Sequence, residues 1–140
     1  HEHRSELHEL SSIEAHESLA EKFQVNAGHI LFHSVIVHFE NEIAIQVEDR
    51  WVNSALAQDY LTQNFISKTP NEYLMEVAPL QGVDYSIEAV MAPKSIADML
   101  HISSKDACLV LHRKTRSQNQ IATIVTMWHP GTRYQFTGSF

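Results

Sequence analysis

Several features that mark particular classes of protein are scarce in this chain of 140 residues. Cys108 is the single cysteine, which excludes an internal disulfide and suits a reducing compartment. No apolar run approaches the ~20 residues that cross a bilayer. The first ten residues, HEHRSELHEL, also lack the apolar core of a secretory signal. We therefore expect a cytoplasmic protein.

Positive charge is scarce as well. Ten lysines and arginines stand against 17 acids, which gives a formal net charge of −7 at pH 7. Residues 112–116, HRKTR, form the only basic run, and the alternation of a strand would divide them between two faces. Because DNA phosphates are bound by clustered cations, this chain alone is not expected to bind DNA.

Signatures of hydrolases and metal enzymes are missing too. With four glycines, the chain has neither a Gly-x-Ser-x-Gly elbow nor a glycine-rich phosphate loop, and Cys108 lies in the apolar run ACLVL. His1, His3 and His8 could supply metal ligands near the N-terminus. Acid and histidine do not recur elsewhere at zinc-helix spacing, so we interpret them as solvated side chains. No metal and no cofactor is expected.

Apolar periodicity and turn residues predict an alternation of helices and hairpins. Residues 1–11 are polar and rich in histidine, which is typical of a linker or an extended lead-in. We expect helices over residues 13–23, 55–63, 70–77 and 93–100, and strands over residues 29–39, 43–52, 83–90, 107–115 and 120–127. Hairpins need antiparallel pairing, so the prediction is an α+β domain with a mostly antiparallel sheet flanked by helices.

The hairpin over residues 32–50, FHSVIVHFENEIAIQVEDR, carries polar residues among apolar ones. Strand residues two apart share a face, so Gln46, Glu48 and Arg50 should project together as an amide, an acid and a base. Such a row can hold a small polar ligand. The alternative is a solvent-facing ion pair on an edge strand, which would contribute only ~0–1 kcal/mol.

Three stretches of the chain resemble the effector-binding half of the GntR/HutC family of transcription regulators. They are HSVIVHFENEIAIQVEDRWVNSALAQDYL, TPNEYLMEVAPL and HPGTRYQFTGSF, in the family's order, and the resemblance runs from about residue 14 to residue 140. It implies a chorismate-lyase-like (UTRA) fold over residues 1–140. It also implies a homodimer that reads operator DNA through an N-terminal winged helix-turn-helix domain, which this chain lacks.

The resemblance also implies a ligand. In related regulators an acid at the position of Glu48 and a polar residue at that of His38 line the effector cavity. Members that bind sugar phosphates tend to have arginine where this chain has His38, so a phosphorylated sugar is not expected. The similarity is to members that control histidine breakdown, which implies urocanate, an imidazole joined through a double bond to a carboxylate.

Two orientations of urocanate are compatible with these residues. In the first, Arg50 binds the carboxylate while Glu48 and His38 hold the ring, since a guanidinium offers two parallel donors to a carboxylate. In the second, the carboxylate lies at the amino end of the helix that Thr69 caps, where free amides attract anions. The sequence favours neither.

Aromatic walls would complete the site, although aromatic residues are common in ordinary cores. The candidates are Tyr85, Trp128 and Tyr134, and Tyr134 ranks first because HPGTRYQF resembles a segment that closes the family's cavity. His33 and Ser86 are weaker candidates, chosen as polar residues among apolar neighbours.

The most favoured function is thus a small-molecule sensor of a transcription repressor, not an enzyme. A chorismate-lyase-like enzyme is the first alternative, because a Glu and an Arg beside a carboxylate pocket could serve a pyruvate elimination. A sensor of another small carboxylate or of a sugar phosphate, and a dimerisation module with an empty pocket, are the others. A shared fold does not fix the choice.

Overall fold

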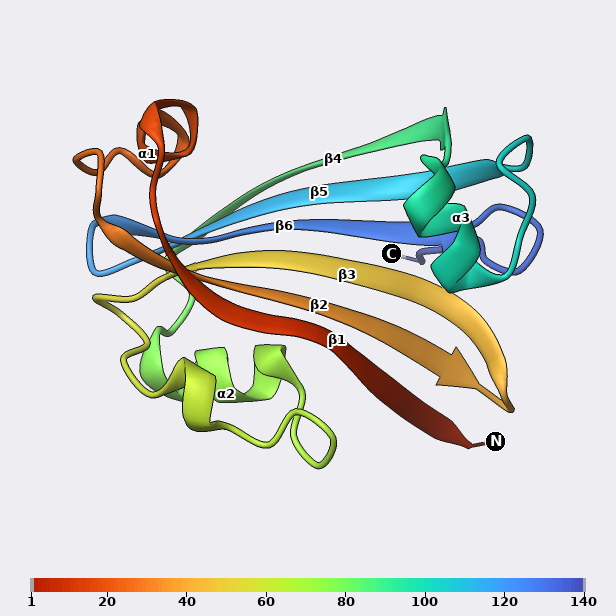
Figure 1. Ribbon diagram of the computed structural model, residues 1–140, viewed down its shortest axis with the longest axis horizontal. Helices are drawn as coiled ribbons and strands as arrows, with labels where there is room; N and C mark the ends of the chain where they lie inside the picture. Colours follow the sequence, from red (N-terminus) through yellow and green to blue (C-terminus); the bar gives the residue numbers. More distant parts are fainter. Residues whose placement is uncertain (1, 140) are drawn as a thin grey trace.

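The computed structural model describes residues 2–139, and a single six-stranded antiparallel sheet forms its centre (Figure 1). The spatial strand order is β1-β2-β3-β6-β5-β4. The strands are β1 His3–Glu14, β2 Ile30–Glu40, β3 Ile43–Asn53, β4 Gly82–Met91, β5 Ala107–Ser117 and β6 Gln120–Pro130. The helices are α1 Glu17–Phe23, the short 3-10 helix η1 Tyr60–Thr62, α2 Pro70–Val77 and α3 Lys94–Leu100. The predicted α+β class is confirmed.

Two tight turns set the register of the sheet. Asn41 and Glu42 join β2 to β3 with φ of 49° and 67°, and Gln118 and Asn119 join β5 to β6 with φ of 52° and 61°. Positive φ at both central residues is the geometry whose twist matches that of two paired strands. The β2–β3 turn places Ile36 opposite Glu48 and Ser34 opposite Arg50.

The two faces of the sheet are covered differently. Figure 1 shows α1 and α3 above opposite ends of one face, and α2 below the other. We call these the α1/α3 face and the α2 face. The core beneath α2 and η1 contains Phe32, Ile36, Val52, Tyr60, Tyr73 and Leu74. Glu48 and Arg50 belong to this face, because they alternate with Val47, which packs in the core beneath α3.

The linker predicted for residues 1–11 is wrong. Most of this segment belongs to β1, which pairs antiparallel with β2 along its length, with an irregularity between Leu7 and Glu9. β1 is an edge strand that stays largely exposed, which explains its polar composition. The polar composition of an exposed edge strand was therefore interpreted as that of a linker.

Two predicted helices differ from the structure. The helix expected over residues 13–23 begins at Glu17, because Ile13 pairs in β1 and His16 caps α1 by accepting a hydrogen bond from the Leu19 amide at 3.3 Å. The helix expected over residues 55–63 is a series of turns ending in η1. There the Asn53 side chain accepts from the Ala55 amide at 3.0 Å and closes a local turn, which competes with a helix.

The capping of α2 agrees with the prediction. Thr69 Oγ1 accepts from the Glu72 amide at 3.1 Å, and Pro70 occupies the start of the helix. No helix in the described part of the chain is long and apolar enough to span a membrane.

Candidate functional site

Glu48 lies at the centre of a buried polar network on the α2 face. One of its carboxylate oxygens is 3.1 Å from His38 Nε2, and the other accepts from Arg50 Nε at 2.9 Å. Glu48 is 5% exposed and Arg50 is 4% exposed. β3 is an interior strand of the sheet. The alternative of a solvent-facing ion pair on an edge strand is therefore excluded.

The charges of this network hold one another in the ionised state. Burial raises the pKa of Glu48, but the positive charge of Arg50 and the hydrogen bond from His38 outweigh it and lower the pKa to about 2. Burial likewise lowers the pKa of Arg50, while Glu48 raises it, and the net pKa is raised. At neutral pH the site therefore holds a carboxylate and a guanidinium.

This pKa predicts an acid-dependent loss of stability. The pKa of Glu48 is about 2 in the folded protein, below its ordinary value of 4.5, so the stabilisation is present above pH 4.5 and is lost as the pH falls toward 2. The native protein should be more stable than the Glu48→Gln variant at pH 5. This difference in the free energy of unfolding should become about 2 kcal/mol smaller when the pH is lowered from 5 to 3. Urea unfolding at several pH values measures it. A difference that does not change with pH would contradict the folded-state charge.

Tyr60 lies beside the same network. It is fully buried, its hydroxyl is 2.8 Å from Ser34 Oγ, and burial raises its pKa to about 12. The phenol is therefore neutral and can hydrogen-bond without adding charge. Ser34 stands opposite Arg50 in the β2–β3 register.

Arg113 on β5 adds a second guanidinium to this face. Arg50, Arg113 and Asn71 of α2 line a small cavity of about 20 Å³, together with the hydroxyl-bearing Thr115 and Thr123. Burial and the charge of Arg50 lower the pKa of Arg113. Arg113 makes no ion pair or hydrogen bond with any described residue. Arg50 is compensated by Glu48, so an unneutralised positive charge remains, and it suits an anion.

Sequence reasoning missed Arg113 because it lies in the basic run that was set aside as divided between two faces. The alternation of side chains along β5 could have identified Arg113, because it shows which face of the sheet each residue of the run occupies. Arg113 pairs with Val125 of β6, and Val125 pairs with Arg50 of β3. Arg113 therefore shares the face of Arg50.

The other end of the network is rich in imidazoles. Nε2 of His3, on β1, lies 3.2 Å from Nδ1 of His38. The two imidazole rings stack, with their centroids 5.3 Å apart. His129 is buried, its Nδ1 donates to the Leu109 carbonyl at 3.1 Å, and its Nε2 accepts from the Gln46 amide at 2.9 Å. Burial lowers the pKa of His129, so its ring is neutral. Neither His3 nor His129 was predicted.

Tyr134, which the resemblance places in a segment that closes the cavity, lies beside His129 at this end. Its ring is 4.2 Å from that of His129, and Phe136 packs edge-on against both. Arg133 anchors the segment by donating to the carbonyls of Ala44 and Leu100 at 2.9 and 2.8 Å. Tyr134 thus bounds the imidazole-rich end.

Three predicted residues lie on the α1/α3 face instead. His33 alternates with Ser34, so its ring points away from Arg50; it contacts Glu9 and Asp49 and stacks on Trp51 at 3.9 Å. Trp128 packs against the core beneath α3, and Ser86 alternates with Tyr85. The structure therefore does not bring His33, Ser86 and Trp128 to Glu48.

The two remaining predicted residues, Tyr85 and Thr69, are not on the α1/α3 face. Tyr85 is on the α2 face and opposite Arg113, but it sits on edge strand β4 and is 70% exposed. Thr69 is at the amino end of α2, where its hydroxyl is engaged in capping. No group of three or more metal-ligating side chains gathers within residues 2–139.

Comparison with known proteins tests the family. The model of the UTRA domain matches residues 1–135. The chain belongs to the UTRA domain family. It is also similar to the "Histidine utilization repressor" of Klebsiella aerogenes and of Pseudomonas putida, with 39% identity to each over 140 residues. It spans 58% and 56% of those proteins, a little over half their length.

Solved structures agree with this placement. The C-terminal domain of the histidine utilization repressor of Pseudomonas syringae pv. tomato superposes with a TM-score of 0.95 and 38% identity over 99% of both chains. PhnF of Mycobacterium smegmatis shares the fold, with a TM-score of 0.88 and 15% identity over 99% of this chain and 62% of its own. The predicted resemblance is confirmed, and the relatives are named as repressors rather than enzymes.

Proposed function

We propose that this UTRA domain is the urocanate-sensing domain of a transcription repressor of histidine catabolism. The observation that carries the proposal is the buried cluster of Glu48, Arg50 and His38 beside the unpaired charge of Arg113. Its relatives are named for histidine utilization. A ligand of that pathway would carry both a carboxylate and an imidazole, and the cluster offers partners for each.

In the favoured orientation the ligand carboxylate lies by Arg113 and Arg50, and the imidazole faces Glu48 and His38. The cavity at Arg50 and Arg113 has a volume of only about 20 Å³, so binding would require α2 to move away from the sheet. A guanidinium can give a carboxylate two parallel hydrogen bonds, and an ionised Glu48 accepts from a ring N–H. The reversed orientation would place the carboxylate at the amino end of α2. We favour the first because Arg113 lacks a partner among the described residues, whereas Thr69 already satisfies the Glu72 amide.

The intact regulator is proposed to be a cytoplasmic homodimer that binds operator DNA through a domain outside this chain. Edge strand β4 exposes Tyr85, Ile87 and Met91, at 70%, 46% and 54%, and this apolar strip suits a second copy. Ligand binding would release DNA by favouring one arrangement of the dimer, because a ligand shifts an equilibrium only through its differential affinity. Sedimentation equilibrium tests the dimer; a monomer at all concentrations would contradict it.

Thermal unfolding with a panel of ligands tests the proposed function. Urocanate at ~100 times its dissociation constant should stabilise the domain by about 2.7 kcal/mol, which corresponds to a rise in Tm of roughly 5–10 °C. Histidine, imidazole-propionate, glucosamine-6-phosphate and chorismate serve as comparisons. If only chorismate or only the sugar phosphate raised Tm, that compound and not urocanate would be the ligand. Turnover of chorismate would support the enzymatic alternative.

A further inference from the structure

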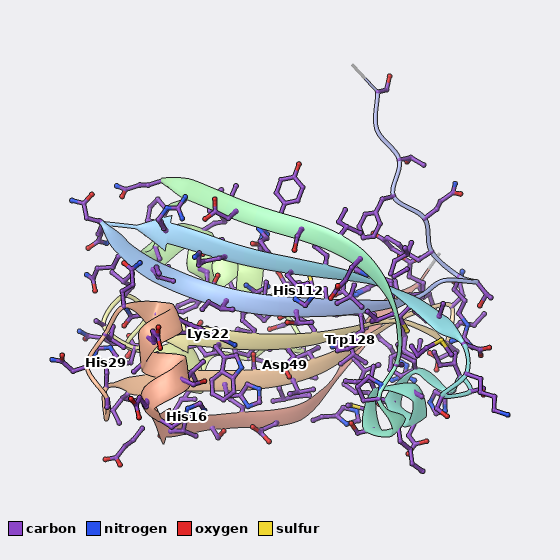
Figure 2. All side chains as sticks on the ribbon, turned by 90° about the horizontal axis from the view of Figure 1, so that it is seen from above. His16, Lys22, His29, Asp49, His112 and Trp128 are labelled. Atoms are coloured by element: carbon purple, nitrogen blue, oxygen red, sulfur yellow. The ribbon has the colours of Figure 1, made fainter. Side chains whose placement is uncertain are left out.

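A groove opens on the α1/α3 face, on the opposite side of the sheet from Glu48. It has a volume of about 430 Å³ and lies between α1 and the strands β4, β5 and β6. Its lining includes Lys22, Ser86, His112, Lys114, Ile124 and Thr126. Figure 2 looks onto this face and shows Lys22 of α1 and His112 of β5 on the same side of the sheet. The volume is within the range of small-molecule sites, roughly 300–1,000 Å³.

Two lysines that form no salt bridge with a described residue line this groove. Lys22 and Lys114 make no salt bridge and no hydrogen bond with any described residue. Asp84 also lines the groove; Arg116 engages it at 2.6 Å and is the main cause of its lowered pKa, to which the charge of Lys114 adds a smaller attraction. Two lysines without a salt bridge beside one groove favour the approach of an anion.

The remaining lining supplies hydrogen-bonding groups and an apolar floor. His112 Nε2 is 2.8 Å from Glu88, and its Nδ1 is 3.4 Å from the Thr126 hydroxyl. The Ser86 hydroxyl has no hydrogen-bond partner within residues 2–139 and can donate to a ligand. Ile124 contributes apolar surface between the polar groups. This combination suits an anion with an apolar body.

We propose that this groove is a second ligand site, which binds a small organic carboxylate between Lys22 and Lys114. Strand alternation makes the two sites separate. In the basic run of β5, alternation places the side chain of Arg113 on the face of Glu48, although the residue also borders the groove, and it places those of His112 and Lys114 on the face of the groove. The run that looked too divided to bind DNA thus supplies cations to two different anion sites.

Backbone amide NMR tests the site, with cinnamate as the probe. Cinnamate carries a carboxylate on a flat apolar body and has no imidazole. We expect saturable shift changes around Ser86, His112 and Thr126, and at least a tenfold weaker affinity in the Lys22→Gln/Lys114→Gln double variant. Lys105→Gln is the matched control, because Lys105 is an exposed, unpaired lysine on the turn before β5. It should bind cinnamate like the native protein.

The outcomes separate this site from the Glu48 site. Shifts confined to residues near Glu48 and Arg50 would overturn the proposal, and so would an affinity that the double variant leaves unchanged. Inorganic phosphate is the second probe, and a groove that binds phosphate but not cinnamate would contradict the apolar requirement. The amide spectrum of each variant reports its fold directly, so a misfolded variant would be recognised. If the double variant misfolds, the single variants Lys22→Gln and Lys114→Gln replace it, and each should bind cinnamate more weakly than the native protein.

Discussion

Replacing Glu48 with alanine is expected to lower the free energy of unfolding by about 3–5 kcal/mol. The reason is the guanidinium left behind. Arg50 is 4% exposed, and Glu48 is the acid that compensates it, through the 2.9 Å hydrogen bond to Nε. A buried charge that loses its partner keeps the cost of its dehydration without the attraction that offset it. Urea unfolding followed by circular dichroism measures the loss.

A double variant separates charge from packing. Glu48→Ala/Arg50→Met removes both charges and should recover most of the lost stability, since apolar replacements of a buried ion pair are often close to neutral. Asp98→Ala is the surface control. It breaks the exposed ion pair with Lys94, 2.9 Å long, and should cost less than about 0.5 kcal/mol. A cost below 1 kcal/mol for Glu48→Ala would mean that Arg50 reaches solvent.

The second large effect is expected at Arg113. Arg113→Met should weaken urocanate binding by about 10- to 100-fold, because hydrogen bonds to a charged group contribute about 1.5–3 kcal/mol. The same change should leave the domain as stable as before or slightly more stable. Arg113 is half-buried, its pKa is lowered by burial and by the charge of Arg50, and no described acid compensates it. Titration calorimetry and urea unfolding measure the two effects.

A residue with a purely structural role would behave in the opposite way. Arg113→Met would then lower stability and leave the affinity for urocanate unchanged, which would contradict its place in the site. Arg116→Met is the matched control on the same strand. Arg116 pairs with Asp84 near the surface, so its loss should change neither urocanate affinity nor, by more than about 1 kcal/mol, stability.

Much of the fold could be predicted from local patterns. The β2–β3 hairpin follows from β-branched residues on both arms of a polar turn, and Thr69, Pro70 and Glu72 mark the start of α2. The shared face of Glu48 and Arg50 follows from the two-residue period of a strand. These features depend on residues close in sequence, which a single sequence displays.

What the sequence did not reveal depends on pairing between distant segments. β1 looks like a polar linker because its stability comes from β2, and its contribution of His3 to His38 depends on that pairing. Arg113 reaches Arg50 only because β6 lies between β5 and β3. His33 and Ser86 were grouped with Glu48 by polarity, although alternation places them across the sheet. Assigning a face to each residue before grouping would have separated them.

A crystal structure of the domain with saturating urocanate would test the central claim most directly. We predict that urocanate lies on the α2 face, with its carboxylate hydrogen-bonded to the guanidinium of Arg113 or Arg50. Its imidazole should lie within hydrogen-bond distance of Glu48 or His38. Urocanate bound only in the groove by Lys22 and Lys114, or absent from both faces, would contradict the assignment of the Glu48 network as the effector site.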